Sequence, residues 1–480
     1  MGLSTIREVL ESIDPAASHG SGAPPSVDEV YAPPGHESAL DPERVLVIGD
    51  RGMGKTFWTW SLVGKDSRMY LNDIFPRLGL SNCDVGIGFV GEDMAADGAI
   101  STGVFDQLQS QGFDAELIWR VVILRAVLLN QKIAPPADTF WKLLTWASED
   151  IERFQIALRD VDQGVSRSGR KVVVIFDALD RLGNNWATIR QRTIALLRVG
   201  LALRSYRGIR IKIFMRSDQA ADPALFAFPD ASKLFGARVD LFWERRDLFG
   251  LAYARLARNQ TSKSEFSELI KNAGGLWADG GTLPDVLKHD PNAQENVFVA
   301  LAGPYMGSDW RKGKTYTWLH NHLADAHGRV SPRSFLSALR AAALYRPIPD
   351  DRLFEPRALQ RGVQEASALR VAQLEEEFPW IKDALRPLAD LRVPATTEAL
   401  FDRWLEGSTP EAIARQASSE RFLPPIEFGD KPDGASPEAL VEALKRIGVA
   451  EARPDGRINM PDIYRVAAKL LRMGGIKPRA

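Results

Sequence analysis

The chain has 480 residues and a mass of 53.2 kDa, a length that corresponds to about three domains. Hydrophobic residues make up 45% and charged residues 26%, and the formal net charge of -1 excludes a bulk attraction to nucleic acid or anionic membrane. A local basic patch is not excluded by that sum. The single cysteine, Cys83, excludes an internal disulfide framework and a cysteine-based zinc cluster. The sequence has no signal-peptide pattern, and no apolar run reaches about 18 residues, so we expect a cytoplasmic protein without a membrane partner.

Residues 1–44 hold one short amphipathic piece, at 6–13, followed by a stretch at 19–34 that is rich in Pro, Gly, Ser and Ala. Such a composition supplies little apolar surface for a core of its own. We therefore expect an N-terminal arm that packs loosely along the edge of the domain that follows.

Residues 45–62 carry the most informative pattern in the chain. The apolar run 45–48 is typical of a strand buried on both faces, the next eight residues fit G-x-x-x-x-G-K-[ST], and an amphipathic run follows directly. Glycines allow a turn whose N–H groups face phosphate oxygens, and the helix that follows adds its positive dipole end. Lys55 would reach the β- and γ-phosphates and Thr56 would ligate Mg²⁺. The alternative, a glycine-rich turn that binds nothing, is disfavoured because strand, loop and helix occur in the required order. The predicted nucleotide-binding residues here are Gly49, Asp50, Arg51, Gly52, Met53, Gly54, Lys55, Thr56 and Phe57.

From residue 45 the pattern alternates strands and helices for about 200 residues, which predicts a parallel sheet covered on both faces. The expected further strands are 85–90, 172–176, 210–215 and 239–241, and the expected helices are 113–131, 140–166 and 184–207.

Three polar residues follow these strands where ligands bind in open α/β sheets. Asp177 comes directly after the apolar run 172–176 and can hold Mg²⁺, directly or through water. Its alternative role is a helix N-cap, which a phosphate loop upstream makes less favourable. Asp180 would orient or deprotonate the attacking water, unless it only pairs with a nearby arginine. Arg216 would contact the γ-phosphate, or would be a salt-bridged arginine at a strand end, with equal weight.

Beyond residue 243 the pattern is helical, with helices expected at 262–273, 292–301, 316–326 and 332–345. Pro332 fits the first turn of the last of these, and Arg333 is badly placed for its dipole, which suggests a role elsewhere. A helix at 439–447, a hairpin at 449–460 and a closing helix at 462–473 suggest a winged helix. The expected division is an N-terminal arm at 1–44, a nucleotide-binding core at 45–242, a helical lid at 243–350 and a helical, winged-helix-like region at 351–480.

Three segments together resemble the motifs of a known class. GDRGMGKT, IFDALDRL and IKIFMRSD, in this order, resemble the phosphate loop, Walker B and sensor-1 segments of STAND and KAP-type P-loop ATPases, which are relatives of AAA+ proteins. The D-x-x-D-R form of the second segment is similar to KAP and NACHT members, in which the second acid belongs to the site. GRVSPRSF resembles the sensor-2 segment of the AAA+ lid, which would add Pro332 and Arg333 to the site. The likeness covers about residues 45–343.

The resemblance implies an α/β core with strand order 5-1-4-3-2, then a helical lid and a C-terminal winged helix, with ATP and Mg²⁺ bound between core and lid. In such families bound nucleotide often acts as a latch for oligomerisation or effector release. Ala178 stands where many AAA+ enzymes have a catalytic glutamate, so we expect slow hydrolysis.

Three functions compete. The leading one is an ATP-dependent switch or assembly module of bacterial antiphage defence signalling, which self-associates and acts with separately encoded effector or sensor proteins. The second is an AAA+ DNA-associated ATPase of the initiator or transposition-regulator type, which would hold DNA through the winged helix. Its expected phosphate contacts are Arg453, Arg457, Arg465, Lys469 and Arg472. The third is a structural module with a degenerate phosphate loop, against which the intact Lys55, Thr56 and Asp177 argue.

Overall fold

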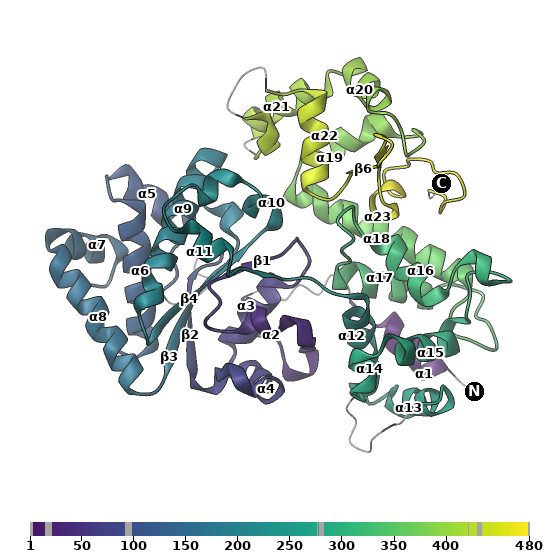
Figure 1. Cartoon of the computed structure of the whole chain (residues 1–480), viewed down its shortest axis with the longest axis horizontal. Coiled ribbons are helices and arrows are strands. Elements are labelled where there is room, and N and C mark those ends of the chain that lie inside the picture. The colour runs from purple at the N-terminus through teal and green to yellow at the C-terminus, as the bar shows by residue number, and fades with distance from the viewer. Residues whose placement is uncertain are drawn as a thin grey trace. The chain divides into compact units, whose positions relative to one another are not determined.

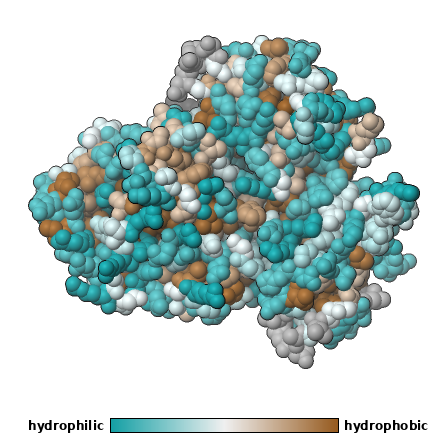
Figure 2. Space-filling view, viewed as in Figure 1, coloured by the Kyte–Doolittle hydropathy of each residue, from teal (hydrophilic) through white to brown (hydrophobic). Residues whose placement is uncertain are grey.

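The computed structural model describes residues 3–14, 22–91, 98–275, 277, 283–420, 422–429 and 434–478. The chain divides into two compact units: an α/β unit, Ser18–Phe242, and a helical unit that combines Met1–Ala17 with Trp243–Ala480. In the part of the chain that is described, no helix is long and apolar enough to cross a membrane. On the face drawn in Figure 2, hydrophilic side chains predominate and hydrophobic ones occur in small patches, as is usual for globular proteins.

A five-stranded parallel sheet forms the centre of the α/β unit, with the order β2-β3-β4-β1-β5 (Figure 1). The same order, counted from the other edge, is the 5-1-4-3-2 that the sequence resemblance implies, so the expected P-loop α/β fold is confirmed. Val47 pairs in register with Phe214 on one side and with Val239 on the other, which places β1 between β4 and β5. The strands are β1 Leu46–Ile48, β2 Cys83–Phe89, β3 Lys171–Phe176, β4 Ile209–Met215 and β5 Val239–Asp240.

Helices cover both faces of this sheet (Figure 1). The ring of Trp119, from helix α6 Ala115–Asn130, meets the Phe176 ring edge-on at 5.4 Å between centroids. Trp60, from helix α3 Lys55–Val63, packs with Ile87. Ile87 is in register with Ile175, the neighbour of Phe176, and adjacent strand residues point to opposite faces. Helices α3 and α6 therefore lie on opposite faces and give three layers.

The α/β unit has further helices at α2 Glu37–Leu40, α4 Lys65–Ile74, α5 Thr102–Ser110, α7 Phe140–Glu149, α8 Ile151–Arg167, α9 Trp186–Ala202, α10 Ser217–Ala220 and α11 Ala231–Phe235. The single helix expected at 140–166 is wrong, because the chain breaks between α7 and α8. At the break, Asp150 has an extended backbone and its carboxylate accepts a hydrogen bond from the backbone N–H of Arg153 at 2.9 Å. A carboxylate in that position caps a new helix instead of continuing the old one.

The helical unit contains α1 Ser4–Glu11, α12 Arg245–Arg258, α13 Lys263–Asn272, α14 Val286–His289, α15 Pro291–Ala302, α16 Thr315–Leu323, α17 Pro332–Ala343, α18 Pro356–Glu377, α19 Ile381–Leu385, α20 Thr397–Glu406 and α21 Thr409–Glu420. The first helix is not part of an arm on the α/β unit, as the sequence analysis expected for 1–44. Arg7 of α1 is buried and donates hydrogen bonds to the carbonyls of Ala343 and Leu353, each at 2.7 Å. Helix α1 is thus a packed element of the helical unit.

The C-terminal segment has α22 Pro437–Arg446, the antiparallel strands β6 Glu451–Ala452 and β7 Ile458–Asn459, and α23 Asp462–Arg465. The closing helix expected at 462–473 is wrong, since α23 ends at Arg465. The fully buried guanidinium of Arg465 donates to the carbonyls of Leu470 at 3.1 Å and Ile476 at 2.9 Å, so the chain folds back around it. The grouping of these elements as a winged helix stays a prediction.

Candidate nucleotide-binding site

The phosphate loop runs from the carboxyl end of β1 to the amino end of α3. The Gly49 N–H donates to the Met215 carbonyl at 3.0 Å, which ties the start of the loop to the end of β4. Gly52 and Gly54 have φ of 81° and 97°, a backbone region that residues with a Cβ atom rarely adopt. Trp58 N–H donates to the Gly54 carbonyl at 2.9 Å and begins α3. The loop therefore ends at the helix amides and the positive dipole end that an anion requires.

The ammonium of Lys55 lies over this loop. Its Nζ donates hydrogen bonds to the carbonyls of Gly49 at 2.7 Å and Asp50 at 2.9 Å. The same positive charge acts on Asp177 and Asp218 and favours the ionised form of both carboxyls, whereas burial opposes it; the net pKa is raised for Asp177 and lowered for Asp218. Lys55 thus sits among the loop and two carboxylates, where a triphosphate would need a cation.

Thr56 and Asp177 are 121 residues apart in sequence and are brought into direct contact. The Thr56 hydroxyl donates to Asp177 Oδ2 at 2.8 Å, and the other carboxylate oxygen accepts from the Ala178 N–H at 2.8 Å. Asp177 is 3% exposed, and burial raises its pKa above the ordinary value despite the opposing effects of Lys55 and the two hydrogen bonds. A hydroxyl and a carboxylate are hard oxygen ligands of the kind that Mg²⁺ takes in small number, so this pair fits the ion.

Arg216 and Asp180 lie at the same edge of the sheet. Arg216 forms a bidentate pair with Asp218, with Nε and Nη2 donating at 2.8 and 2.7 Å, and its Nη1 lies 3.4 Å from Asp180 Oδ2. The structure thus shows the ion pair that was the alternative to phosphate contact for Arg216. Asp218, two residues after Arg216, was not singled out from the sequence. Burial alone would raise its pKa, but the charge and hydrogen bonds of Arg216, together with Lys55, lower it.

Sequence reasoning also missed His36, which packs against helix α3 behind the phosphate loop. The buried His36 ring N–H at Nε2 donates to the Phe242 carbonyl at 2.9 Å, and burial lowers the His36 pKa to about 4. His36 packs edge-on against Trp58 at 5.6 Å, and Trp58 packs edge-on against Phe57 at 5.1 Å. Trp58 is fully buried, so its indole packs in the core behind the phosphate loop.

Other predicted loop residues divide by exposure. Met53 is buried, whereas Asp50, Arg51 and Phe57 are half-buried and Gly52 is exposed. Buried Met53 fills the interior of the turn while its neighbours remain at the surface, where a ligand can reach their backbone.

Pro332 and Arg333 begin α17 in the helical unit. Ser331 is the N-cap, with its hydroxyl accepting from the Ser334 N–H at 3.0 Å. The participation of Pro332 and Arg333 in the nucleotide site stays a prediction.

The strand order, the glycine-framed loop after β1 and the carboxylate after β3 define a P-loop α/β protein. No protein-family model matches the chain, and no curated protein matches it either.

Several solved structures are similar to the chain at low TM-scores. The Walker-type ATPase of Pyrococcus abyssi has a TM-score of 0.39 and 15% identity, over 91% of this chain and 97% of that one. The Aeropyrum pernix ORC2 protein in ADPNP–ADP complexes has 0.31 and 14%, over 91% and 92%. The Aeropyrum pernix ORC1 protein in complex with DNA has 0.35 and 12%, over 95% and 93%. At these scores the matches do not decide the fold or function of this chain, which follow from its own residues.

Proposed function

We propose that this protein is a slow ATPase that binds Mg²⁺ and ATP at the phosphate loop and uses the bound nucleotide as a switch. The contact between the Thr56 hydroxyl and the buried Asp177 carboxylate at 2.8 Å is the observation that carries the proposal. It brings the loop that would hold phosphates to the strand end that would hold the metal. A glycine-rich turn without a ligand has no need for this pairing.

Each residue has a role in binding. Loop N–H groups would donate hydrogen bonds to the phosphate oxygens, the dipole of α3 favours their negative charge, and the Lys55 ammonium neutralises charge on the β- and γ-phosphates. Thr56 and Asp177 are the residues that would hold Mg²⁺, which supplies further positive charge to the phosphate oxygens when bound. Asp50, Arg51 and Phe57 border the loop and are proposed to contact the nucleotide, as are Pro332 and Arg333 of the helical unit.

Hydrolysis is proposed to be slow for a structural reason. The residue after Asp177 is Ala178, which has φ of 55° and no group that can accept a proton. Asp180 remains to orient the attacking water, and it already faces Arg216 at 3.4 Å. A carboxylate oxygen that lies against a guanidinium is less available to a water molecule. Long occupancy by ATP suits a latch better than a motor.

The proposed biological setting is bacterial antiphage defence signalling, with self-association and with separately encoded effector or sensor proteins as partners. Its support is the resemblance of the three motif segments to STAND and KAP-type ATPases. It is tested by measuring the mass of the full chain in solution with and without ATP. We expect a change of mass with ATP for the wild type and none for Lys55→Ala.

A matched control is Lys65→Ala, since Lys65 is exposed in the first turn of α4 and lies outside the phosphate loop. It should behave as the wild type does. Tight ATP binding by Lys55→Ala would show that the assigned site is wrong. ATP binding at the site without any change of mass would leave the ATPase standing and remove the assembly role.

The alternative is a DNA-associated ATPase, but some of the arginines expected to contact DNA phosphates are bound to acidic residues instead. Arg465 is fully buried, with its guanidinium bound to Asp462 at 2.7 Å, so it is not a phosphate contact. Arg457 pairs with Asp455 at 2.6 Å and Arg472 lies 3.6 Å from Asp462. The presence of DNA in the similar ORC1 structure belongs to that protein. A salt-dependence slope near zero for DNA binding by the full chain would favour the switch.

A further inference from the structure

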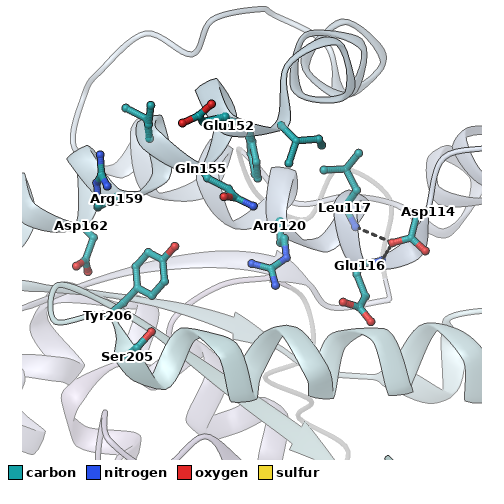
Figure 3. A pocket seen from close by; sticks show the side chains of 13 residues that line it. Asp114, Glu116, Leu117, Arg120, Glu152, Gln155, Arg159, Asp162, Ser205 and Tyr206 are labelled. Carbon is teal, nitrogen blue, oxygen red and sulfur yellow. Dashed lines mark hydrogen bonds between the residues drawn. The ribbon is translucent and has the colours of Figure 1, made fainter.

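A hollow of about 680 Å³ lies in the helical layer of the α/β unit, away from the phosphate loop (Figure 3). Its walls come from the first turns of α6, from α8, and from Ser205 and Tyr206, which precede the amino end of β4. The phosphate loop follows the carboxyl end of β1, and β1 and β4 are parallel. The hollow therefore lies near the amino ends of the strands, opposite the phosphate loop.

Three of the four acidic residues that line this hollow form hydrogen bonds or an ion pair with other residues of the chain. Asp162 Oδ1 accepts hydrogen bonds from the backbone N–H groups of Gly208 at 2.7 Å and Ile209 at 2.8 Å, and so fixes the start of β4. The carboxylate of Asp114 accepts from the Glu116 N–H at 2.8 Å and caps α6. Glu116 itself pairs with Arg198 at 3.2 Å. These hydrogen bonds and this ion pair hold the three carboxylates in fixed positions.

Two arginines in the same hollow are not committed. Within the described part of the chain, neither Arg120 nor Arg159 has a hydrogen bond or an ion pair. Figure 3 shows Arg120 coming from α6, beside Tyr206 from the link to β4. Burial and Asp162 raise the Tyr206 pKa, while Arg120 and Arg159 lower it, so both arginines act on the phenol. Arg120, Arg159 and Tyr206 thus line the same hollow, and all three side chains can donate hydrogen bonds to a ligand in it.

The rim of the hollow is partly aliphatic. Ile151 and Ile156, both on α8 and both lining the hollow, are 45% and 41% exposed. Glu152 lies between them, exposed in the first turn of α8. A nucleic-acid backbone would leave the isoleucines without an apolar partner. A single carboxylate beside an aliphatic side chain matches both features.

We propose that this hollow is a docking site for a segment of a partner protein that carries a carboxylate next to an aliphatic residue. The guanidinium groups of Arg120 and Arg159 bind the carboxylate by charge-assisted hydrogen bonds, which are often bidentate. Ile151 and Ile156 cover the aliphatic side chain. This site does not depend on ATP binding, so its test and that of the ATPase can fail separately.

The test uses the full chain with labelled isoleucine methyl groups and a defined probe, the peptide acetyl-Leu-Glu-Ile-amide, which carries one carboxylate. We expect the peptide to shift the NMR signals of the Ile151 and Ile156 methyls. We expect Arg120→Gln combined with Arg159→Gln to weaken binding by about tenfold or more. The matched control is Arg167→Gln, on the same helix α8 but outside the hollow, where binding should be unchanged.

Other probes give outcomes that would overturn the site. Equal shifts with the peptide in which the Glu is replaced by Gln would remove the role of the carboxylate. An oligothymidylate that shifts the same methyls at lower concentration would assign the hollow to nucleic acid instead. Unchanged binding by the double variant, or no shift up to millimolar peptide, also contradicts the proposal. Thermal unfolding and ATP binding of the double variant confirm that it is folded.

Discussion

In the sheet of the α/β unit, charged side chains near the carboxyl ends of the strands are paired differently from those near the amino ends. At the carboxyl ends of the strands, Thr56 pairs with Asp177, which is buried, and Arg216 pairs with Asp218, which is half-buried. Near the amino ends, Arg120 and Arg159 line a hollow and lack an ion pair among the described residues. Pairing holds a group in one position, and positioned groups are what phosphate chemistry needs. Uncommitted arginines on a surface are instead suited to a partner that supplies the missing charge.

The largest expected effect is on the site at the carboxyl ends alone. Lys55→Ala removes an ammonium that would bond two phosphates, at a cost of about 3 kcal/mol in binding, or roughly a hundredfold. Titration calorimetry with ATP and Mg²⁺ measures this loss, and Lys65→Ala is the control. The peptide site in the hollow should be unaffected. Parallel loss at both sites would mean that the variant had unfolded or that the two sites are not independent.

The second effect separates binding from turnover. Asp177→Ala should retain part of the ATP affinity, because Lys55 and the loop amides remain, but should lose Mg²⁺-dependent phosphate release by about a hundredfold. Phosphate release and ATP binding, each measured with Mg²⁺ and with a chelator, give the two quantities. Turnover equal to that of the wild type would show that Asp177 is only a structural cap.

A third prediction concerns Lys212, a buried cation whose hydrogen bonds stabilise the fold and which belongs to neither of the two sites. Lys212 of β4 is fully buried, and its Nζ donates to the carbonyls of Ala39, Asp41 and Arg44 at 2.9 to 3.0 Å. Burial lowers the Lys212 pKa from 10.5 to about 7. Between these values the unfolded chain binds more protons, so stability rises with pH and the burial penalty is relieved.

The measurement is the free energy of unfolding of the wild type and of Lys212→Met. From pH 7 to about pH 9, the wild type should gain about 2 kcal/mol relative to the variant. A difference that stays constant with pH would place the Lys212 pKa near its ordinary value. The control is Lys233→Met, at an exposed position of α11.

The smallest expected effect concerns His36, which packs against Trp58 of helix α3. Because burial lowers the His36 pKa from 6.5 to about 4, the unfolded chain binds more protons between these values. Stability due to neutral His36 is therefore lost as the pH falls through this window. From pH 7 to about pH 5 the wild type should lose roughly 1–2 kcal/mol relative to His36→Phe. His289→Phe, at an exposed position in α14, should follow the wild type, and equal acid sensitivity of His36→Phe would contradict the role of His36.

The features predictable from sequence were those set by short, local patterns. The apolar run before Gly49 and the spacing of the glycines from Lys55 and Thr56 are local, and they indicate the loop that the structure shows. The strand order followed from the motif resemblance, and the order of the five strands agrees with it. Asp177 was found because it ends a buried apolar strand, a position visible without knowledge of the fold.

What could not be predicted depends on contacts between distant residues. His36 meets the Phe242 carbonyl across 206 positions, and no pattern near His36 marks that contact. The hollow arises where α6, α8 and the link to β4 meet, so Arg120 and Arg159 gain meaning only once these elements are in place. Helix α23 also ends early because of contacts that no local pattern shows, since the Arg465 guanidinium donates hydrogen bonds to the carbonyls of Leu470 and Ile476. A local signal existed for Asp150, an N-cap residue type within an apparently continuous helix.

The central claim is that Thr56 and Asp177 hold one divalent cation together with ATP. It is tested most directly by electron paramagnetic resonance with Mn²⁺ in place of Mg²⁺, on the wild type and on Thr56→Ala combined with Asp177→Ala. The wild type should bind one Mn²⁺ per chain in the presence of ATP, and the double variant should not hold the ion in an ordered protein site. An identical Mn²⁺ signal from the two proteins would contradict the account.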